Sequence, residues 1–439
     1  MARYELTEDR LAALRGGLGD GGRPDAATRR ALNAATTTDV DQLAINRDAV
    51  VVLGPEVEGK LDSLSVTDQK QSGRCWMFAA FNVFRHRVAK ELGVENFEFS
   101  EAYLQFYDLL GKAEVFLDSI AKFEPPYDER EAALLLGYPD GDGGWWEFFT
   151  SLVKRFGVVP KYAMPETQSS SQTRAMGRAL GTVLRRGALA IDAGNATKED
   201  VLRDVYRVLA VHLGVPPEEF TWQYRDKDGE FHREGTITPR EFAERFLPDL
   251  DEYVQLGNDP RPDRPFGTRY LTEGQQNVPG GAEFTWVNAS AEELKATARR
   301  SLEAEEPVWF SNDVKRQLQQ KLGLWDTKLL DTDLFYGIDS ELSKGDQMAT
   351  RESVLTHAMV FTGYDEGVEG VTPPRWRVEN SWGSKKFSSE GGEGYGVASD
   401  RWFDDNVFTI VVHRRFVDEK LLAAFDAEPV VLPPWDAMS

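Results

Sequence analysis

Apolar residues recur every three or four positions in the segment that follows the single cysteine of the chain. Five large side chains form one stripe, at Met77, Phe81, Phe84, Val88 and Leu92. A stripe with this period predicts an amphipathic helix whose apolar face is buried. Thr67, Asp68 and Ser72 precede it, and Gly73 interrupts any earlier element. We therefore expect the helix to begin at or beside Cys75.

A different pattern marks the last third of the chain. Short segments rich in β-branched and aromatic residues are separated by turns, as in EPVWFSNDV (306–314), HAMVFTGYD (357–365), RWRVENSWG (375–383) and VFTIVVHRRFV (407–417). Such segments predict the strands of a small antiparallel sheet or barrel. Helices followed by strands indicate an α+β fold.

These patterns divide the chain into five parts. The first and the last look like arms, because the first has two short helical pieces around a Gly-rich break and the last contains Pro433-Pro434 and should be extended. A charged, helical stretch between the two main parts looks like an insertion. The predicted parts are an N-terminal arm (1–60), a helical subdomain (61–167), a helical insertion (168–280), a β-rich subdomain (281–414) and a C-terminal arm (415–439).

Charge and composition limit the classes of function. The chain has 439 residues and a formal net charge of −22, from 73 acidic and 51 basic residues. This charge repels nucleic acid and anionic lipid, so we expect neither as a partner, although a solvated acidic surface is also common in cytoplasmic proteins. No apolar run approaches the roughly 20 residues of a membrane span, and the first residues lack the apolar centre of a signal peptide. We expect a cytoplasmic protein.

The single cysteine is a candidate nucleophile. One cysteine cannot form an intramolecular disulfide or a cysteine-based zinc site, and we expect neither a metal nor a cofactor. An unreactive core cysteine is the more common case. Cys75, however, follows Arg74 and stands at the predicted start of a helix. The positive end of a helix dipole favours the thiolate.

Three polar side chains complete a possible catalytic set. Gln69 lies in a polar loop, where its amide can donate to a developing oxyanion. His357 opens a predicted strand, and ENSWG offers Asn380 to orient its ring and Trp382 to shield their hydrogen bond from water. Cys, His and Asn form a thiol nucleophile with a base and an orienting amide. His86 is expected to face solvent or to cap a helix. The histidines without a comparable context are His212, His232 and His413.

The segments QSGRCWMFA, THAMVFTGYD and VENSWG resemble the papain-like cysteine peptidases. The flanking segments, among them DGGWWEFFTSLVKRFGVVPKYAMPE and EPVVLPPWD, are similar to the branch that contains bleomycin hydrolase and bacterial aminopeptidase C. This similarity extends over essentially the whole chain. It implies a papain-like fold, in which a helical subdomain packs against an antiparallel β-barrel-like subdomain.

The resemblance also implies residue roles and an activity. Cys75 matches the nucleophile, His357 the general base and acid, Asn380 the orienting residue and Gln69 the oxyanion-hole donor. The implied activity is that of a thiol aminopeptidase, which acts on peptides with a free N-terminus. The candidate substrate-binding residues are Gly143 and Gly144, which match a glycine pair that binds an extended substrate backbone, together with Trp382 and Ser439.

The spacing of the matching residues adds a prediction about assembly. His357 and Asn380 follow Cys75 at about twice the separation of roughly 130–150 residues found in ordinary papain-like enzymes. The additional residues between Cys75 and His357 correspond to the predicted insertion. In the bleomycin hydrolase branch such an insertion contributes to a hexameric barrel whose active sites face an inner channel. The resemblance therefore implies a homohexamer.

The C-terminal arm is where the chain departs from the family pattern. In the family this segment lies in the enzyme's own cleft, and its carboxylate pairs with the free amine of the substrate. Trp435 is a candidate anchor for it. Because relatives continue a few residues past the Trp-Asp pair, we expect the Ser439 carboxylate to lie further from Cys75. This predicts some release of two or three residues, or limited endopeptidase cleavage.

Three alternatives stay open at this point. Some relatives bind DNA, so one alternative is a nucleic-acid-binding hexamer, which the net charge disfavours. A catalytically inactive scaffold is disfavoured because all four candidate catalytic residues are present. A thiol acyltransferase or deamidase would use the same residues as a peptidase.

Overall fold

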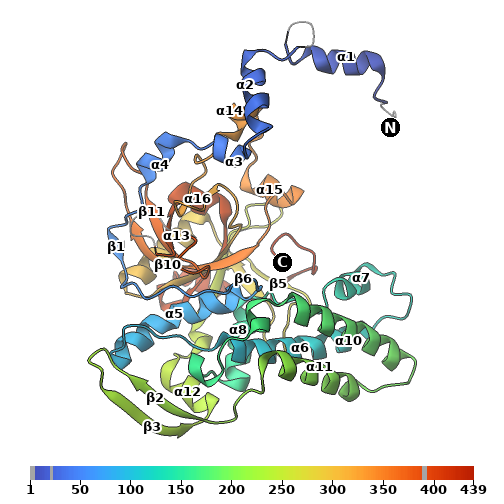
Figure 1. The fold of residues 1–439 in the computed structure, drawn as a ribbon, viewed down its shortest axis with the longest axis vertical. Helices are drawn as coiled ribbons and strands as arrows, with labels where there is room; N and C mark the ends of the chain where they lie inside the picture. The colour runs from blue at the N-terminus through green and yellow to red at the C-terminus, as the bar shows by residue number, and fades with distance from the viewer. Residues whose placement is uncertain (1–4, 20–22, 388–392) are drawn as a thin grey trace.

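The computed structural model describes residues 5–19, 23–387 and 393–439. In Figure 1 a sheet with its covering helices lies above a mainly helical part, and the two meet where α5 runs beneath β10. The predicted α+β fold class is confirmed. Within the described residues, no helix is both long and apolar enough to span a membrane.

The helical part is organised around α5 (Cys75–Leu92), which packs against α8, β7 and β10. The predicted apolar stripe is buried, and each of its five side chains is at most 8% exposed. The helix begins at Cys75, as the sequence predicted. The other helices of this part are α6 (Glu101–Ile120), α7 (Arg130–Gly137), α8 (Trp146–Phe156), α9 (Gln168–Ser171), α10 (Arg174–Asp192), α11 (Lys198–Leu213) and α12 (Pro239–Phe246).

The main sheet contains twelve strands within the described residues, in the order β14-β5-β6-β4-β13-β7-β10-β11-β12-β9-β8, with β1 paired to β10. Its strands are β1 (Gly59–Lys60), β4 (Tyr253–Gly257), β5 (Arg269–Thr272), β6 (Thr285–Asn288), β7 (Val308–Asn312), β8 (Leu318–Gln319), β9 (Leu324–Trp325), β10 (His357–Asp365), β11 (Arg375–Glu379), β12 (Tyr395–Ser399), β13 (Val407–His413) and β14 (Val430–Leu432). The accompanying helices are α13 (Ala291–Glu303), α14 (Thr332–Tyr336), α15 (Lys344–Thr350), α16 (Asp400–Asn406) and α17 (Glu419–Ala424).

The register of β10 brings two distant polar residues together. β10 is antiparallel to β11, and Val360 lies opposite Glu379. The start of one strand therefore lies near the end of the other, because neighbouring antiparallel strands run in opposite directions. His357 is the first residue of β10, and Asn380 directly follows β11.

The predicted insertion from 168 to 280 is helical only in part. After α11 the chain forms a hairpin of β2 (Phe220–Arg225) and β3 (Phe231–Ile237), which pack as a separate two-stranded sheet. β4 and β5 then pair within the main sheet, so the β-rich part begins at Tyr253 and not at residue 281. These strands are four or five residues long, and their pairing with β13 and β14 is nonlocal, which the local pattern does not reveal.

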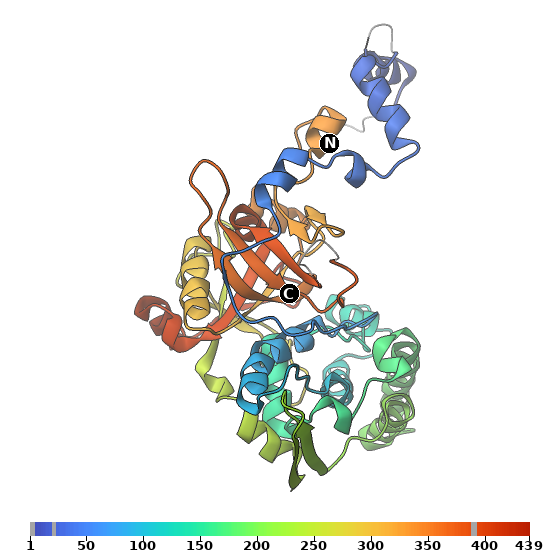
Figure 2. The ribbon, with the colours of Figure 1, turned by 60° about the vertical axis from the view of Figure 1, so that its left-hand side comes forward.

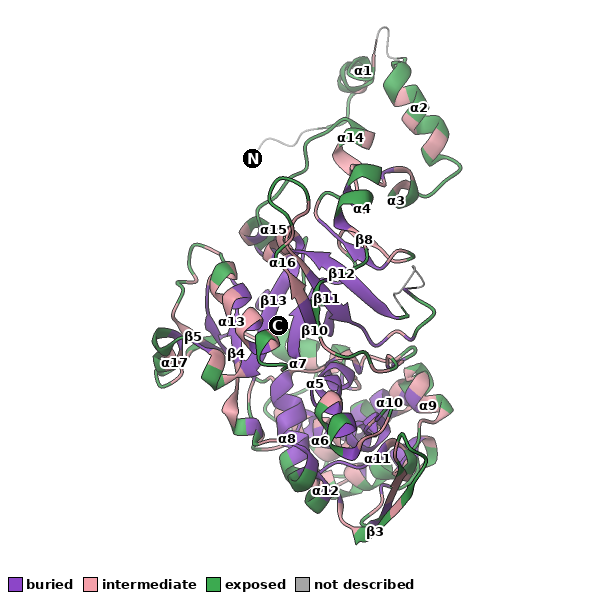
Figure 3. Ribbon diagram, turned by 90° about the vertical axis from the view of Figure 1, so that its left-hand side faces the viewer, coloured by how far each residue is buried: buried purple, intermediate pink, exposed green. Residues whose placement is uncertain are grey.

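The N-terminal arm begins away from the body of the protein. α1 (Glu8–Gly16) and α2 (Ala26–Ala35) have no buried residues, and they project beyond the sheet in Figures 1 and 2. Figure 3 shows the contrast between these exposed helices and the buried strands. α3 (Val40–Leu43) and α4 (Arg47–Leu53) lead back to the sheet, where Leu53 is fully buried.

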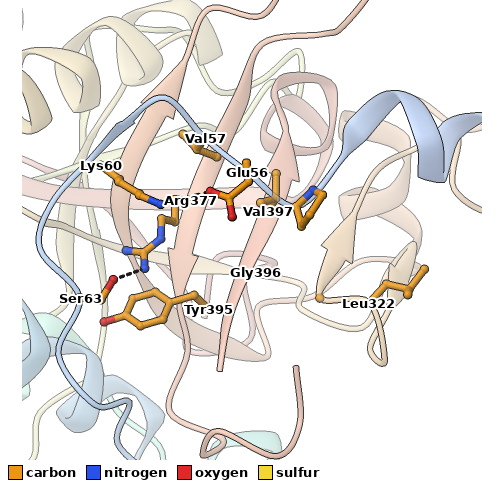
Figure 4. A pocket seen from close by; sticks show the side chains of 11 residues that line it. Glu56, Val57, Lys60, Ser63, Leu322, Arg377, Tyr395, Gly396 and Val397 are labelled. Carbon is orange, nitrogen blue, oxygen red and sulfur yellow. Dashed lines mark hydrogen bonds and ion pairs between the residues drawn. The ribbon is translucent and has the colours of Figure 1, made fainter. Parts of the chain in front are cut away.

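The end of this arm crosses the sheet as an extended strap. β1 pairs with β10, and Leu61 N–H donates to Thr362 O at 2.8 Å. Figure 4 shows Arg377 of β11 reaching Ser63 of the strap, whose hydroxyl oxygen accepts from Nη2 at 2.6 Å. A polar cavity of about 70 Å³ lies here. None of the residues that line it also lines the cavity beside Cys75.

The C-terminal arm is extended only over β14, which pairs in parallel with β5. The prediction that the rest is extended was wrong, because residues 434–438 form turns. Asp436 N–H donates to Pro433 O at 3.0 Å and Ser439 N–H donates to Asp436 O at 3.1 Å. Pro433-Pro434 excludes a helix, and it is also compatible with a turn.

Candidate active site

Cys75 is the first residue of α5 and lies at the surface of a cavity of about 740 Å³. The first N–H groups of a helix have no partner within the helix, so they remain available to a ligand. The loop before the helix is fixed by Asp142, whose carboxylate accepts from Gly73 N–H at 2.7 Å. The indole N–H of Trp76 donates to Asp142 O at 3.1 Å. The position of Cys75 is thus fixed from both sides.

His357 and Asn380 form one hydrogen-bonded unit. His357 Nε2 lies 2.8 Å from Asn380 Oδ1, and both side chains are buried. Ser381 N–H donates to the same oxygen at 2.7 Å, which identifies this atom as the acceptor. An amide oxygen only accepts, so the imidazole proton is on Nε2 and Nδ1 is left as a proton acceptor.

His357 and Cys75 line the same cavity. The backbone N–H of Ala358, the residue after His357, points at the Cys75 sulfur and favours the thiolate. The start of β10 is therefore in contact with the start of α5. The structure brings together a thiol and an imidazole that are far apart in the sequence.

Gln69 is held in place by two hydrogen bonds. Its Oε1 accepts from Ser381 Oγ at 2.7 Å, and its Nε2 donates to Ser72 O at 2.7 Å. Its side chain lines the cavity beside Cys75. An amide group has two N–H donors, so one donor remains for a ligand. Ser381 therefore connects Gln69 with Asn380.

The glycine pair lines the cavity, and its two members have different reasons to be glycine. A side chain at Gly144 would meet the Trp76 ring at 2.6 Å, so packing alone requires a glycine there. Nothing lies within 4 Å of the corresponding position at Gly143. Gly143 O accepts from Lys112 Nζ at 2.6 Å. Only Gly143 leaves open space of the kind expected for a substrate backbone.

Trp382 packs against His357, with the ring centroids 4.9 Å apart. It is not among the residues that line the cavity. The structure therefore places it beside the His357 ring, where it limits access of water to the His357–Asn380 hydrogen bond. Pro434 and Ser439 of the C-terminal arm do line the cavity.

Burial opposes a charge on either catalytic candidate alone. Burial raises the pKa of the Cys75 thiol to about 11, although the N–H groups of Ala358 and Trp76 act in the opposite direction. Burial lowers the pKa of His357 to about 4, although Asn380 acts in the opposite direction. At Cys75 burial therefore outweighs the N–H groups that favour the thiolate.

Arg74 does not supply the positive charge that the sequence suggested. Its guanidinium is buried and makes a bidentate pair with Glu166, at 2.9 and 2.7 Å. This pairing neutralises the charge beside the thiol. A thiolate at Cys75 therefore depends on transfer of its proton to His357. Two opposite charges roughly 4 Å apart attract by about 4 kcal/mol near a protein surface, which offsets only part of the cost that burial imposes on the two charges.

The remaining histidines are engaged elsewhere. His86 was expected to face solvent or cap a helix, and this was wrong, because its Nε2 lies 3.1 Å from the buried Glu379 carboxylate. His212 lies 2.7 Å from Ser169 Oγ, and His232 lies 2.7 Å from Asp226. His413 accepts from Arg415 N–H. Among the described residues, no group of three or more His, Cys, Asp or Glu side chains is arranged to hold a metal ion.

Sequence reasoning missed several residues that support the site. Glu379 is fully buried, pairs with Arg85 of α5 through a short contact and also contacts His86. It joins the helix that carries Cys75 to the strand that precedes Asn380. Glu379 and Ser381 flank Asn380 in VENSWG, so their position next to the orienting residue was the available signal. Asp142 is the first residue of the family-like segment DGGWWEFFTSLVKRFGVVPKYAMPE, but its bond to Gly73 is visible only in the structure.

Comparison with known proteins agrees with this geometry. The model of the Peptidase C1-like family matches residues 17–439. Aminopeptidase C of Lactobacillus delbrueckii subsp. lactis is 36% identical, with 93% of each chain covered. Aminopeptidase C of Listeria monocytogenes serovar 1/2a is 37% identical, with 90% of each chain covered. The crystal structure of PepW from Lactobacillus rhamnosis HN001 is 35% identical and superposes with a TM-score of 0.92, covering 99% of this chain and 98% of that one.

The chain therefore belongs to the Peptidase C1-like family. It is an enzyme of the cysteine-peptidase class with a papain-like fold, as the sequence motifs predicted. Its similarity to curated aminopeptidases places it in the branch that the motifs indicated.

Proposed function

We propose that this protein is a thiol aminopeptidase that removes N-terminal residues from peptides and amides. The observation that carries the proposal is the cavity that joins Cys75, Gln69 and His357 to Ser439 of the C-terminal arm. A nucleophile, a base and an oxyanion donor suit acyl transfer. An arm at the end of the same cavity limits how much substrate extends past the nucleophile, which suits an exopeptidase.

Each residue has a defined part in the proposed reaction. His357 Nδ1 takes the proton of Cys75 as the sulfur attacks the substrate carbonyl, and Asn380 holds the ring and stabilises the imidazolium. Cys75 N–H and the free N–H of Gln69 receive the oxyanion. His357 then protonates the leaving amine, and it activates the water that hydrolyses the thioester.

The C-terminal arm is the proposed gate. Its last residues are fixed by Asp436, whose carboxylate pairs with Arg261 at 2.8 Å and with Arg264 at 3.1 Å. Ala437 and Met438 are buried, and we assign Ser439 to contact with the free amine of the substrate. A firmly held arm gives the cleft a fixed end.

Hydrolysis of leucine 4-nitroanilide and its N-acetylated form tests the activity and its gate. We expect the free-amine substrate to be preferred by at least tenfold, and deletion of residues 435–439 to reduce this preference. A wild-type enzyme that cleaves both substrates equally, with no effect of the deletion, would contradict the gate. An acyltransferase would instead transfer the leucyl group to an added amine in preference to water.

We also propose a cytoplasmic homohexamer. The support is the exposed N-terminal arm, in which Leu14 and Leu32 are 61% and 44% exposed, together with the family resemblance. Exposed apolar side chains on projecting helices suit contact with further copies. Light scattering at micromolar concentration should give about six times the chain mass of 49.3 kDa. A monomer at that concentration would contradict the proposal.

A further inference from the structure

The C-terminal arm is attached to the body by more than one kind of contact. Leu432, Ala437 and Met438 are buried in an apolar cluster, and the ion pairs of Asp436 hold the turn that follows β14. These contacts fix the tail on the side of the sheet. They leave Trp435, between the anchors, only partly buried. The sequence had suggested Trp435 as the anchor in an apolar slot, and this was wrong because Met438 and Ala437 take that place.

Trp435 instead connects the tail to two other elements. The guanidinium of Arg130 lies over its indole ring, 4.0 Å from the centroid. Arg351, at the end of α15, donates a short hydrogen bond to the carbonyl oxygen of Trp435. Within the described part of the chain, Arg130 has no carboxylate within 4 Å, so the indole ring is its electrostatic partner.

Arg130 is the first residue of α7, a short helix that packs against α6. Ala132 is its only buried residue. Its C-terminal end is held by Arg185 of α10, which donates to Leu136 O at 2.8 Å. At the N-terminal end of α7, Arg130 contacts the ring of Trp435. α7 therefore bridges α10 and the C-terminal arm.

The same short helix forms a wall of the active-site cavity. Glu131, Leu134 and Leu135 line it, together with Tyr138 just beyond the helix. Pro434 and Ser439 line the cavity from the tail. The stack of Arg130 on Trp435 thus joins two walls of one cavity outside the catalytic residues.

We propose that Arg130 and Trp435 form a latch that holds α7 against the C-terminal arm and sets the width of the cavity where the N-terminal residue of the substrate lies. This inference rests on the proposed function. Both are positioning residues, since they act through α7 and the tail. With the latch closed, the amine of the substrate meets Ser439 while its first side chain packs on Leu134 and Leu135. With the latch open, an acetylated or longer N-terminus fits as well.

Kinetics of latch variants test the proposal. The substrates are leucine 4-nitroanilide, its N-acetyl form and glycyl-leucine 4-nitroanilide. In Arg130→Ala we expect the preference for the free single residue over the other two to fall about 2- to 5-fold, the range that an exposed cation–π contact supports. The change should come from a higher KM for leucine 4-nitroanilide, with kcat within about twofold. Arg130→Lys keeps a cation above the ring and should restore most of the preference.

Three further variants separate the latch from a general effect of charge or folding. Arg178→Ala removes the same charge from the exposed face of α10 and should leave the preference unchanged. Trp435→Ala should act like Arg130→Ala, and the double variant should be no worse than either single one, because both remove the same contact. An unchanged preference in Arg130→Ala, or an equal loss in Arg178→Ala, would overturn the latch.

Hydrogen exchange distinguishes failure of the latch from failure of the proposed function. In Arg130→Ala, amides of residues 130–137 should exchange at least about threefold faster than in wild type, whereas Arg178→Ala should not change them. Unchanged exchange overturns the latch even if the protein is an aminopeptidase. Faster exchange in a protein that does not cleave leucine 4-nitroanilide would support the contact and overturn its role in selecting the substrate, together with the proposed function.

Discussion

The two walls of the cleft are built on different principles. The helical wall places Gln69, Cys75 and Trp76 within eight residues of one another, so a single loop and the start of α5 define their geometry. The sheet wall takes His357 from the start of β10 and Asn380 from the residue after β11, and the pairing of the two strands brings them together. The first wall is local in sequence and the second depends on strand register.

The difference shows why the two walls need explicit connections. Ser381 joins Asn380 to Gln69, and Glu379 joins the sheet to Arg85 and His86 of α5. A buried carboxylate is costly unless it is paired. Glu379 therefore stabilises only the arrangement in which α5 lies against the end of β11. Such a link fixes the position of the thiol relative to the imidazole.

Removing the nucleophile from the helical wall should have the largest effect. We expect Cys75→Ala to lower hydrolysis by several orders of magnitude, because losing a covalent nucleophile typically has this cost. Thermal melting and the oligomeric state should stay unchanged, since the volume change is small. Residual turnover above about one part in a thousand would show that another group is the nucleophile.

Removing the base, His357, from the sheet wall tests whether Cys75 and His357 ionise together. In His357→Ala the thiol must lose its proton alone, with a pKa raised by burial to about 11. Only about 10⁻⁴ of it is then thiolate at pH 7, and alkylation by iodoacetamide should rise about tenfold per pH unit up to that value. In wild type, where the proton passes to His357, alkylation should be fast and nearly independent of pH between about 6 and 8. Similar profiles for both proteins would contradict the pairing.

Removing the carboxylate of Glu379, which links the two walls, should lower the stability of the fold. Burial raises the pKa of Glu379, but the charges of Arg85 and His86 outweigh burial, so the pKa lies below its usual value. Glu379→Gln should lower the free energy of unfolding by about 3–5 kcal/mol, because Arg85 is left buried without its partner.

The pH dependence of that loss follows from the sign of the shift. A carboxylate with a lowered pKa stabilises the fold above its unfolded value of about 4.3, and this stabilisation is lost as the pH falls through the folded value. The difference between wild type and Glu379→Gln in chemical denaturation should therefore shrink below about pH 4. Substitution of the exposed Glu419, also to Gln, is the matched control and should change stability by less than about 0.5 kcal/mol.

The smallest expected effect is the loss of turnover when Gln69, the proposed oxyanion donor on the helical wall, is removed. Gln69→Ala should lower kcat roughly 10²–10³-fold with little change in KM, as for loss of one oxyanion donor. Ser381→Ala leaves the amide in place without its fixed Oε1 partner, so its effect should be smaller than that of Gln69→Ala. If Gln69→Ala raised KM alone, Gln69 would bind the substrate in its ground state.

The sequence predicted the local wall more completely than the link between the walls. The apolar stripe and the breaks before it predicted a helix that begins at or beside Cys75, and the motifs identified Gln69, Cys75 and His357, which line one cavity. The pairing of Arg74 with Glu166 and of His86 with Glu379 could not be predicted, because each partner comes from a distant segment. The same holds for the turns of the C-terminal arm, which depend on Arg261 and Arg264.

The sequence by itself determined α5, the strands at 308–312, 357–365, 375–379 and 407–413, the family motifs and the chemical identity of the candidate site, since these depend on residue type and on short-range periodicity. Only the tertiary structure decided the environment of that site. It buries His357 and partly buries Cys75, which opposes a charge on either group alone, and it assigns β4 and β5 to the main sheet. Burial and strand pairing join residues hundreds of positions apart, and no local pattern encodes them.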